Sequence, residues 1–287
     1  MQSDYIMSIN RALNYIYQNL DKTLTVEEIA EHCCFSKYHF NRVFKAIVGE
    51  NVYCFTKRIK LESAAFRLRA AKNRSITEIA IETGYSPSNF ASAFKQYFGV
   101  SASRFRKMNE VPYKDTFATV SSHIQNLQKK DNIFDALDKR IKIKRLAGMN
   151  VVYKRIICNY QRELKSAWKS FCMDMEKRFG GHISSFVGIS YDDPLIADED
   201  RCVYDMCMLV DKVSGVDIRW IEPGMYACYA FYDTPDKLIL AFNEIFVLWL
   251  PFCKYKLDNR FALEVYKSEV DEEGKIQLEI CIPIQEV

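Results

Sequence analysis

The sequence lacks the features of a membrane-spanning or exported chain. Its longest apolar stretch, around Ile245–Cys253, is far shorter than the roughly 20 residues that a spanning helix requires. The first residues, Met1-Gln2-Ser3-Asp4, are acidic and no apolar run follows them, so we expect no signal peptide. We therefore expect no membrane partner and a cytoplasmic location.

The C-x-x-C motif and the usual catalytic motifs are also missing. The chain has ten cysteines, yet none forms a C-x-x-C motif, and they are scattered through a sequence rich in apolar residues. This distribution favours reduced, mostly buried thiols over disulfides or zinc ligation. Because no nucleophile–base pair, metal-ligand set or phosphate-binding loop stands out, we expect no catalytic residue, no metal and no cofactor.

Length and charge indicate two domains of different character. A chain of 287 residues fits two domains of ordinary size. Residues 1–110 carry 16 Lys+Arg against 10 Asp+Glu, a net +6, and the remainder carries 24 against 27, a net −3, which together give the overall +3. A basic first half suits a polyanionic partner, although this charge alone does not identify nucleic acid.

An internal repeat at an offset of 50 residues is the strongest signal in the sequence. The matching positions begin with Glu28-Ile29-Ala30 and Glu78-Ile79-Ala80 and end with Lys57 and Lys107. Between them, Ser36, Phe40, Phe44-Lys45, Gly49 and Phe55 match Ser86, Phe90, Phe94-Lys95, Gly99 and Phe105. So many coincidences at one offset indicate a duplicated structural unit.

Each copy has the pattern of a helix-turn-helix. Thr25 or Ser75, followed three residues later by glutamate, forms a capping box that begins a short helix. After a turn, Ser36 or Ser86 caps a second helix whose phenylalanines recur at i and i+4, and a glycine ends it. The alternative is a helical repeat scaffold that binds protein, but two copies without a third favour the helix-turn-helix.

These residues resemble the AraC/XylS family of transcription regulators over about residues 5–108. The resemblance rests on Ser75-Ile76-Thr77-Glu78-Ile79-Ala80, Gly84-Tyr85, Phe90, Phe94-Lys95, Gly99, Ser101 and Phe105-Arg106, together with the linker helix Arg58–Ala64. The chain departs from the family at Ala102, where proline is usual, and at Ser92, where arginine is common. The resemblance implies binding of double-stranded promoter DNA, with RNA polymerase as a further partner.

The face of each second helix opposite the phenylalanines supplies the candidate DNA contacts. In the first copy we expect base contacts from Lys37, Tyr38, Asn41 and Arg42, because arginine can donate two hydrogen bonds to guanine. The second copy offers the shorter Ser88, Asn89 and Ser92, so the first copy should dominate specificity. We expect phosphate contacts from Lys45, Lys57, Arg58, Lys95, Arg104 and Lys107. The alternative is that these side chains form a merely solvated face.

The second half has the pattern of a duplicated α+β domain. We expect a linker over 111–140 and an effector-binding domain over 141–287, after a DNA-binding domain over 1–110. The expected elements are strands at 141–158, 185–191, 201–211, 217–232, 261–268 and 275–284, and helices at 161–179 and 235–250. This order is βαββ followed by βαββ, which predicts an antiparallel sheet with helices on one face and the other face free.

Alternation along the strand at 261–266 suggests a ligand site. We expect the bulky odd-numbered residues to pack under the helices, and Ala262, Glu264 and Tyr266 to point to the open face. Alternation likewise places Tyr226, Cys228, Ala230 and Tyr232 on one face of the strand at 225–233. A carboxylate among aromatic side chains suits an organic cation or an amphiphile, whereas the alternative is that Glu264 is an ordinary solvated strand residue.

Several segments of this half resemble the gyrase-inhibitor-like ligand-binding domains. They are Gly188–Pro194, Tyr204-Asp205 with Cys207, Glu222–Ala227, Trp249-Leu250-Pro251, Glu264-Val265-Tyr266 and Ile282-Pro283. The resemblance implies that Glu264 lies in a site for drug-like molecules, with Tyr266, Tyr226 and Trp249 as its aromatic walls. We therefore expect a regulator, most simply an activator, that senses a small amphipathic, aromatic or cationic molecule. The alternative is a hydrolase of electrophilic compounds with Glu264 as general base.

Overall fold

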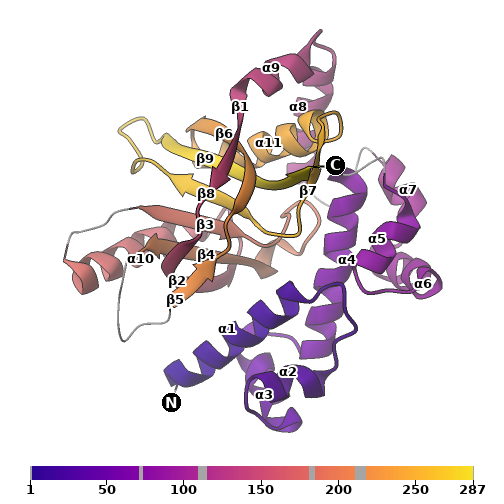
Figure 1. The fold of residues 1–287 in the computed structure, drawn as a ribbon, viewed down its shortest axis with the longest axis vertical. Helices are drawn as coiled ribbons and strands as arrows, with labels where there is room; N and C mark the ends of the chain where they lie inside the picture. Colours follow the sequence, from indigo (N-terminus) through magenta and orange to yellow (C-terminus); the bar gives the residue numbers. More distant parts are fainter. Residues whose placement is uncertain (1, 71–73, 109–114, 181–184, 211–217, 287) are drawn as a thin grey trace. The chain divides into compact units, whose positions relative to one another are not determined.

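The computed structural model describes residues 2–70, 74–108, 115–180, 185–210 and 218–286. The chain divides into two compact units, Met1–Met108 and Asn109–Val287 (Figure 1). The first is helical and the second combines a sheet with helices, as the sequence predicts. The expected fold class is thus confirmed.

The first unit consists of two helix-turn-helix motifs and a long helix between them. Its helices are α1 (Gln2–Gln18), α2 (Val26–His32), α3 (Lys37–Val48), α4 (Val52–Ala70), α5 (Ile76–Glu82), α6 (Pro87–Phe98) and α7 (Ala102–Lys107). Both expected capping boxes are present, since Thr25 and Ser75 each exchange hydrogen bonds with the glutamate three residues later. The second helices of the two motifs, α3 and α6, both end at a glycine in the left-handed conformation, Gly49 and Gly99.

Aromatic side chains form the core of each motif. Phe40 and Phe44 on α3, and Phe90 and Phe94 on α6, are all at most 1% exposed. Phe55 at the start of α4 packs edge-on against Phe44, with ring centroids 5.5 Å apart. Removing such a ring from a packed core costs about 3–5 kcal/mol, so the phenylalanine spacing that identifies the motif also stabilises it.

The segment expected to be a linker contains helices. Within 111–140, α8 (Asp115–Gln128) and α9 (Ile133–Arg140) are helical, and both pack on elements of the second unit. His123 on α8 contacts Glu244, with 2.7 Å between Nε2 and Oε1. Polar composition suggested a linker, but Val120 and Ile124 of α8, four residues apart, are buried, and so is Leu137 of α9. Residues 109–114 lie outside the described part.

The second unit contains nine described strands. They are β1 (Ile141–Leu146), β2 (Met149–Cys158), β3 (Phe186–Ser190), β4 (Cys202–Leu209), β5 (Ile218–Ile221), β6 (Gly224–Asp233), β7 (Tyr255–Leu257), β8 (Ala262–Tyr266) and β9 (Ile276–Glu286). Helix α10 (Leu164–Phe179) follows β2. The second connection holds α11 (Leu238–Asn243), which continues into a π-helical turn (Glu244–Trp249).

The strand order shows the expected duplication. The strands lie in the order β1-β6-β9-β8-β3-β4-β2-β5, all neighbours are antiparallel, and β7 pairs with β9. In each module the first strand pairs with the last, β2 with β4 and β6 with β9, and the middle strands β3 and β8 pair with each other. The two βαββ modules are therefore related by an approximate two-fold axis between β3 and β8.

Two long segments expected to be single strands are each bent. The stretch from 141 to 158 divides into β1 and β2 at Gly148, and the stretch from 217 to 232 divides into β5 and β6 near Pro223. One register runs through both bends, since Leu146 faces Gly224 and Met149 faces Ile221. This bent ribbon joins the β1-β6 side of the sheet to the β2-β5 side. Gly148 is required there, because a Cβ atom would lie 2.0 Å from the Trp220 ring.

Candidate functional site

The predicted base contacts of the first motif lie together on the exposed side of α3. Lys37, Tyr38, Asn41 and Arg42 are all exposed, and Tyr38 is 87% exposed, which is unusual for a large aromatic side chain. The Asn41 side chain is partly engaged, because its Oδ1 accepts a hydrogen bond of 3.3 Å from the backbone of Val52. Arg42 reaches the His39 ring at 3.3 Å, which keeps its guanidinium beside the helix.

The second motif presents a smaller and less basic face. Ser88, Asn89 and Ser92 are exposed on α6, and so is Lys95, in the position that Lys45 occupies on α3. Serines and an asparagine form fewer and weaker contacts with base edges than an arginine that donates two bonds. The structure thus keeps the difference between the motifs that the sequence suggests. The role of each residue in DNA binding stays a prediction.

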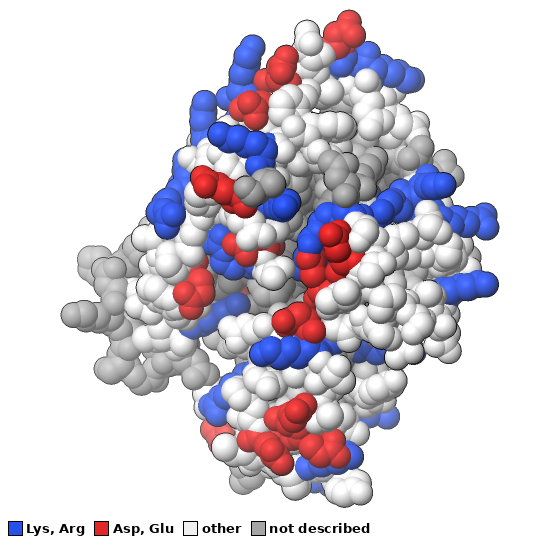
Figure 2. All heavy atoms as spheres, turned by 45° about the vertical axis from the view of Figure 1, so that its right-hand side comes forward, with Lys and Arg blue, Asp and Glu red and all other residues white. Residues whose placement is uncertain are grey.

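Basic and acidic side chains are intermingled on the face of the molecule that Figure 2 shows. Lys37 itself forms an ion pair with Glu27 of α2. One phosphate candidate is wrong: Arg58 is buried in an ionic network and does not face solvent. The Arg58 side chain points inward because helices of both motifs pack against α4.

Glu264 in the second unit is buried and fully hydrogen-bonded. Its side chain on β8 accepts bonds from three hydroxyls, of Ser190 at 2.8 Å, Tyr204 at 2.6 Å and Tyr266 at 2.9 Å. The residue is 4% exposed, so it is no ordinary solvated strand residue. Burial and the nearby carboxylate raise the pKa of both tyrosines well above the ordinary value, so their hydroxyls stay protonated and act as donors.

This carboxylate lies at the approximate two-fold axis of the duplicated domain. Gly188 on β3 is paired directly with Glu264 on β8. A Cβ atom at Gly188 would lie 1.8 Å from the Tyr204 hydroxyl and 3.1 Å from Glu264 Oε2. The missing side chain therefore creates the space in which Tyr204 reaches Glu264. One module contributes the carboxylate, and the other contributes the glycine opposite it.

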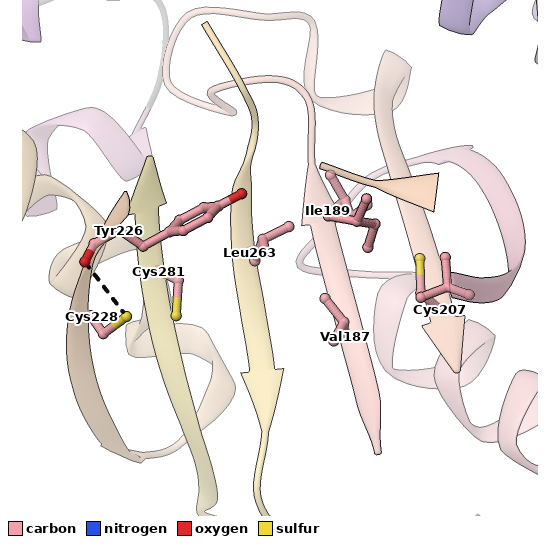
Figure 3. Close-up of a cluster of buried hydrophobic side chains, with 9 residues drawn as sticks. Val187, Ile189, Cys207, Tyr226, Cys228, Leu263 and Cys281 are labelled. Carbon is pink, nitrogen blue, oxygen red and sulfur yellow. Dashed lines mark hydrogen bonds between the residues drawn. The ribbon is translucent and has the colours of Figure 1, made fainter. Parts of the chain in front are cut away.

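The expected assignment of the two sheet faces is wrong. Trp168 of α10 packs on Tyr266, with ring centroids 4.9 Å apart, so Glu264 and Tyr266 point toward the helix. Leu263 instead belongs to a buried cluster on the opposite face with Ile189 and Tyr226 (Figure 3). Bulky apolar residues suggested the helix-covered side, but the bent ribbon closes the other side and gives it an apolar core of its own.

The four predicted ligand residues are consequently only partly assembled. Tyr266 joins Glu264, as expected. Tyr226 lies on the opposite face, where the Arg260 guanidinium stacks 4.6 Å from its ring centroid. Trp249 is buried in the π-helical turn, and its Nε1 donates to Asp138 of α9 at 2.8 Å. Tyr226 is therefore not part of the site around Glu264, and no contact among the described residues links Trp249 to that site.

Sequence reasoning missed three residues around Glu264. Ser190 and Tyr204 lie in segments that carry the family resemblance, but alternation alone gave them no role. Trp168 lies on α10, whose other inward residues, Phe171 and Met175, are ordinary core residues. A signal was available in the alternation along β3 and β8. Gly188, Ser190 and Glu264 are all even-numbered, so they lie on one face of the sheet in the observed register. Using this signal required the strand register, which the sequence does not state.

A second charged cluster lies on the opposite face. Asp205 accepts two bonds of 2.7 Å from Arg155 and further bonds from Arg219 and Tyr191. Burial alone would raise the pKa of Asp205, but the two guanidinium groups lower it overall. Such a paired buried cluster is structural. Among the described residues, no group of three or more His, Cys, Asp or Glu could hold a metal ion, and no helix is long and apolar enough to cross a membrane.

Comparison with known families confirms both resemblances. The model of the GyrI-like small molecule binding domain matches residues 139–285, just over half of the chain, and a helix-turn-helix domain model matches residues 11–108. The chain belongs to the GyrI-like family and carries an AraC-type helix-turn-helix domain. The comparisons give no support to the hydrolase alternative.

Several transcription regulators are similar to about a third of this chain. An uncharacterized HTH-type transcriptional regulator of Haemophilus influenzae is 35% identical over 100 residues, 34% of this chain and 33% of that protein. The transcriptional activator AarP of Providencia stuartii is 33% identical over 108 residues, 37% of this chain and 78% of AarP. The solved C-terminal domain of AraT, a response regulator from Geobacillus stearothermophilus, is 31% identical and covers 38% of this chain and 91% of its own, with a TM-score of 0.34. The chain thus spans about a third of the Haemophilus protein.

Proposed function

We propose that this protein is a cytoplasmic, ligand-responsive transcription activator. Its first unit binds double-stranded promoter DNA through α3 and α6, and its second unit binds a small cationic, amphipathic or aromatic molecule near Glu264. RNA polymerase is the partner through which promoter binding raises transcription. The similar regulators, which include the activator AarP, support this proposal.

The observation that carries the proposal is the environment of Glu264. A carboxylate that is buried among Tyr204, Tyr266 and Trp168 costs desolvation energy that a solvated strand residue would not. An organic cation would compensate that cost, because opposite charges attract more strongly where water is excluded, and the flat rings supply cation–π attraction. Because Glu264 is 4% exposed, a ligand reaches it only when neighbouring side chains such as Trp168 move aside.

A DNA-binding measurement tests the first half of the proposal. DNA sequences selected by the full chain from a random double-stranded pool should be bound with an affinity that falls steeply with salt. Each phosphate neutralised releases condensed counterion and adds about −0.9 to the slope of log K against log salt. Salt-insensitive binding, or failure to select any sequence, would contradict it.

A thermal-shift screen tests the second half. The full chain is heated with cationic dyes, bile-acid-like amphiphiles and aromatic drugs, and the unfolding of the second unit is followed. A ligand at 100 times its Kd stabilises the folded state by about 2.7 kcal/mol, which is easily measured. If neutral and cationic compounds of similar shape stabilise equally, Glu264 is not the determinant of binding. Purified protein should also leave electrophilic esters intact, as a non-enzyme would.

A further inference from the structure

A buried ionic network connects the end of α3 in the first motif with the end of α6 in the second motif. Glu50 follows α3, Arg58 and Glu62 lie one turn apart on α4, and Tyr97 lies near the end of α6. Arg58 donates from Nε to Glu50 Oε1 at 2.9 Å and from Nη1 to Glu62 Oε2 at 3.0 Å. The Tyr97 hydroxyl donates to Glu62 Oε1 at 2.6 Å. The chain of contacts therefore runs from one motif, through α4, to the other.

Water is largely excluded from the three charged side chains of this network, whereas Tyr97 at its end is 40% exposed. The side chains of Arg58, Glu50 and Glu62 are 7%, 11% and 5% exposed, respectively. Burial raises the pKa of Glu62, and it raises that of Tyr97 as well. Buried ion pairs of this kind add little net stability compared with apolar residues of the same volume, because desolvation offsets the attraction. What they do impose is geometry, since each donor has to meet its acceptor.

A second contact, from Lys60 between Arg58 and Glu62 on α4, also links the motifs. The buried Lys60 ammonium donates to the backbone carbonyl of Lys22, which lies just before α2. The same ammonium lies 6.0 Å from the centroid of the Tyr85 ring, in the turn of the second motif. A Cβ atom at Gly84, beside Tyr85, would lie 2.9 Å from that carbonyl oxygen, so the backbones approach closely. The two motifs are thus held at two points along α4.

We propose that Arg58, Glu50, Glu62 and Tyr97 are positioning residues that set which spacing between two DNA half-sites the protein accepts. The inference rests on the proposed DNA binding. Two rigidly linked recognition helices enter successive major-groove segments about 10–10.5 base pairs apart, and one added base pair rotates the second segment by roughly a tenth of a turn. A link with fixed geometry penalises that rotation, whereas a loosened link tolerates it.

The test compares spacing variants of a selected operator. The full wild-type chain first selects its operator from a random pool, and the two half-sites are then moved apart or together by one base pair. We expect wild type to lose affinity on the altered spacings by about a hundredfold, the size expected when one half-site's contacts are misplaced. Tyr97→Phe should bind the original operator nearly as well, but its spacing penalty should fall about tenfold, the worth of a hydrogen bond to a charged group.

Two further variants separate positioning from mere stability. The double change Arg58→Met with Glu62→Leu removes both charges of this ion pair together. It should also reduce the loss of affinity that a changed half-site spacing causes. Tyr53→Phe removes a hydroxyl from an exposed tyrosine of the same helix and should behave as wild type. The circular dichroism of each variant is compared with that of wild type.

The outcomes are distinguishable. The inference is supported if Tyr97→Phe and the double variant lose less affinity than wild type on the altered spacings, while Tyr53→Phe loses as much as wild type. An equal loss of affinity on every spacing assigns the network a purely structural role and overturns it. It is also overturned if wild type accepts all spacings alike, or if both variants keep the full penalty. Failure of wild type to select any DNA overturns the proposed DNA binding itself, which is a separate result.

Discussion

Both halves of this protein contain an internal duplication, but they use it in different ways. In the first unit, the copies keep the same buried phenylalanines and differ on the exposed faces of α3 and α6. In the second unit, the copies share a strand order and meet at the directly paired Gly188 and Glu264. The first duplication repeats a surface, whereas the second builds one site at the junction between its copies.

The difference has a physical origin. DNA repeats along its axis, so two copies of a surface can each contact a successive groove segment. A small molecule is a single object, and a site on a two-fold axis cannot carry two identical carboxylates at close range without strong repulsion. The junction of the two modules accordingly carries one carboxylate, Glu264, with Gly188 directly opposite it.

Adding a side chain at Gly188, where the two modules of the second unit meet, should have the largest effect on stability. Gly188→Ala places a Cβ atom against the Tyr204 hydroxyl, so the ring has to move and the bond to Glu264 is lost. Overpacking and an unsatisfied buried carboxylate together should lower the free energy of unfolding of the second unit by about 2–4 kcal/mol. Urea unfolding measures the loss. Combining it with Tyr204→Phe should cost less than the two single losses added, and full additivity would argue against the clash.

Removing the predicted guanine contact should come next. Arg42→Ala should weaken binding to the selected operator by about 1–3 kcal/mol, and chiefly at one base pair, because arginine discriminates guanine through two donors. Ser92→Ala, at the matching position of the second motif, should change binding by less than about 0.5 kcal/mol. Mobility shifts on single-base operator variants decide this. Equal losses would mean that the two copies contribute alike.

Neutralising Glu264 should have a smaller and more selective effect. Glu264→Gln keeps the shape and removes the charge, so cationic ligands should bind about tenfold more weakly and neutral ones almost unchanged. Tyr266→Leu should weaken both classes, because it removes a ring that contacts either. Titration calorimetry measures both, once circular dichroism shows that each variant is folded. Unchanged cation affinity would make Glu264 a structural residue only.

Making the copies of the first unit more alike should have the smallest effect. Ser92→Arg gives α6 the residue that α3 carries at Arg42. We expect the affinity for DNA to rise by at most about 1 kcal/mol, with a steeper salt dependence if the new side chain contacts a phosphate. The control is Ser92→Gln, which adds length without charge. A loss of affinity would show that the second motif requires a small side chain at this position.

Local signals allowed much of the fold to be predicted from the sequence. Capping boxes, left-handed glycines and phenylalanines at i and i+4 involve neighbours in the chain, so the helix-turn-helix motifs were found with their boundaries. The second unit depends on pairings between distant residues. Alternation located the strands, but it could not say which face lies under α10, and so it placed Glu264 and Tyr226 together. Arg58 was likewise assigned to phosphate because only the fold shows that its helix is enclosed.

The position of β9 has a consequence for how the chain is made. Although β9 follows all the other strands in the sequence, it lies inside the sheet, between β6 and β8. During synthesis, therefore, the sheet cannot close until residues 276–286 have left the ribosome, while the helices of residues 2–108 are held by contacts between near neighbours and can fold earlier. A nascent chain would possess a folded DNA-binding unit before its sensor exists. Speed of translation through the second half thus sets how long an unregulated DNA-binding unit is present.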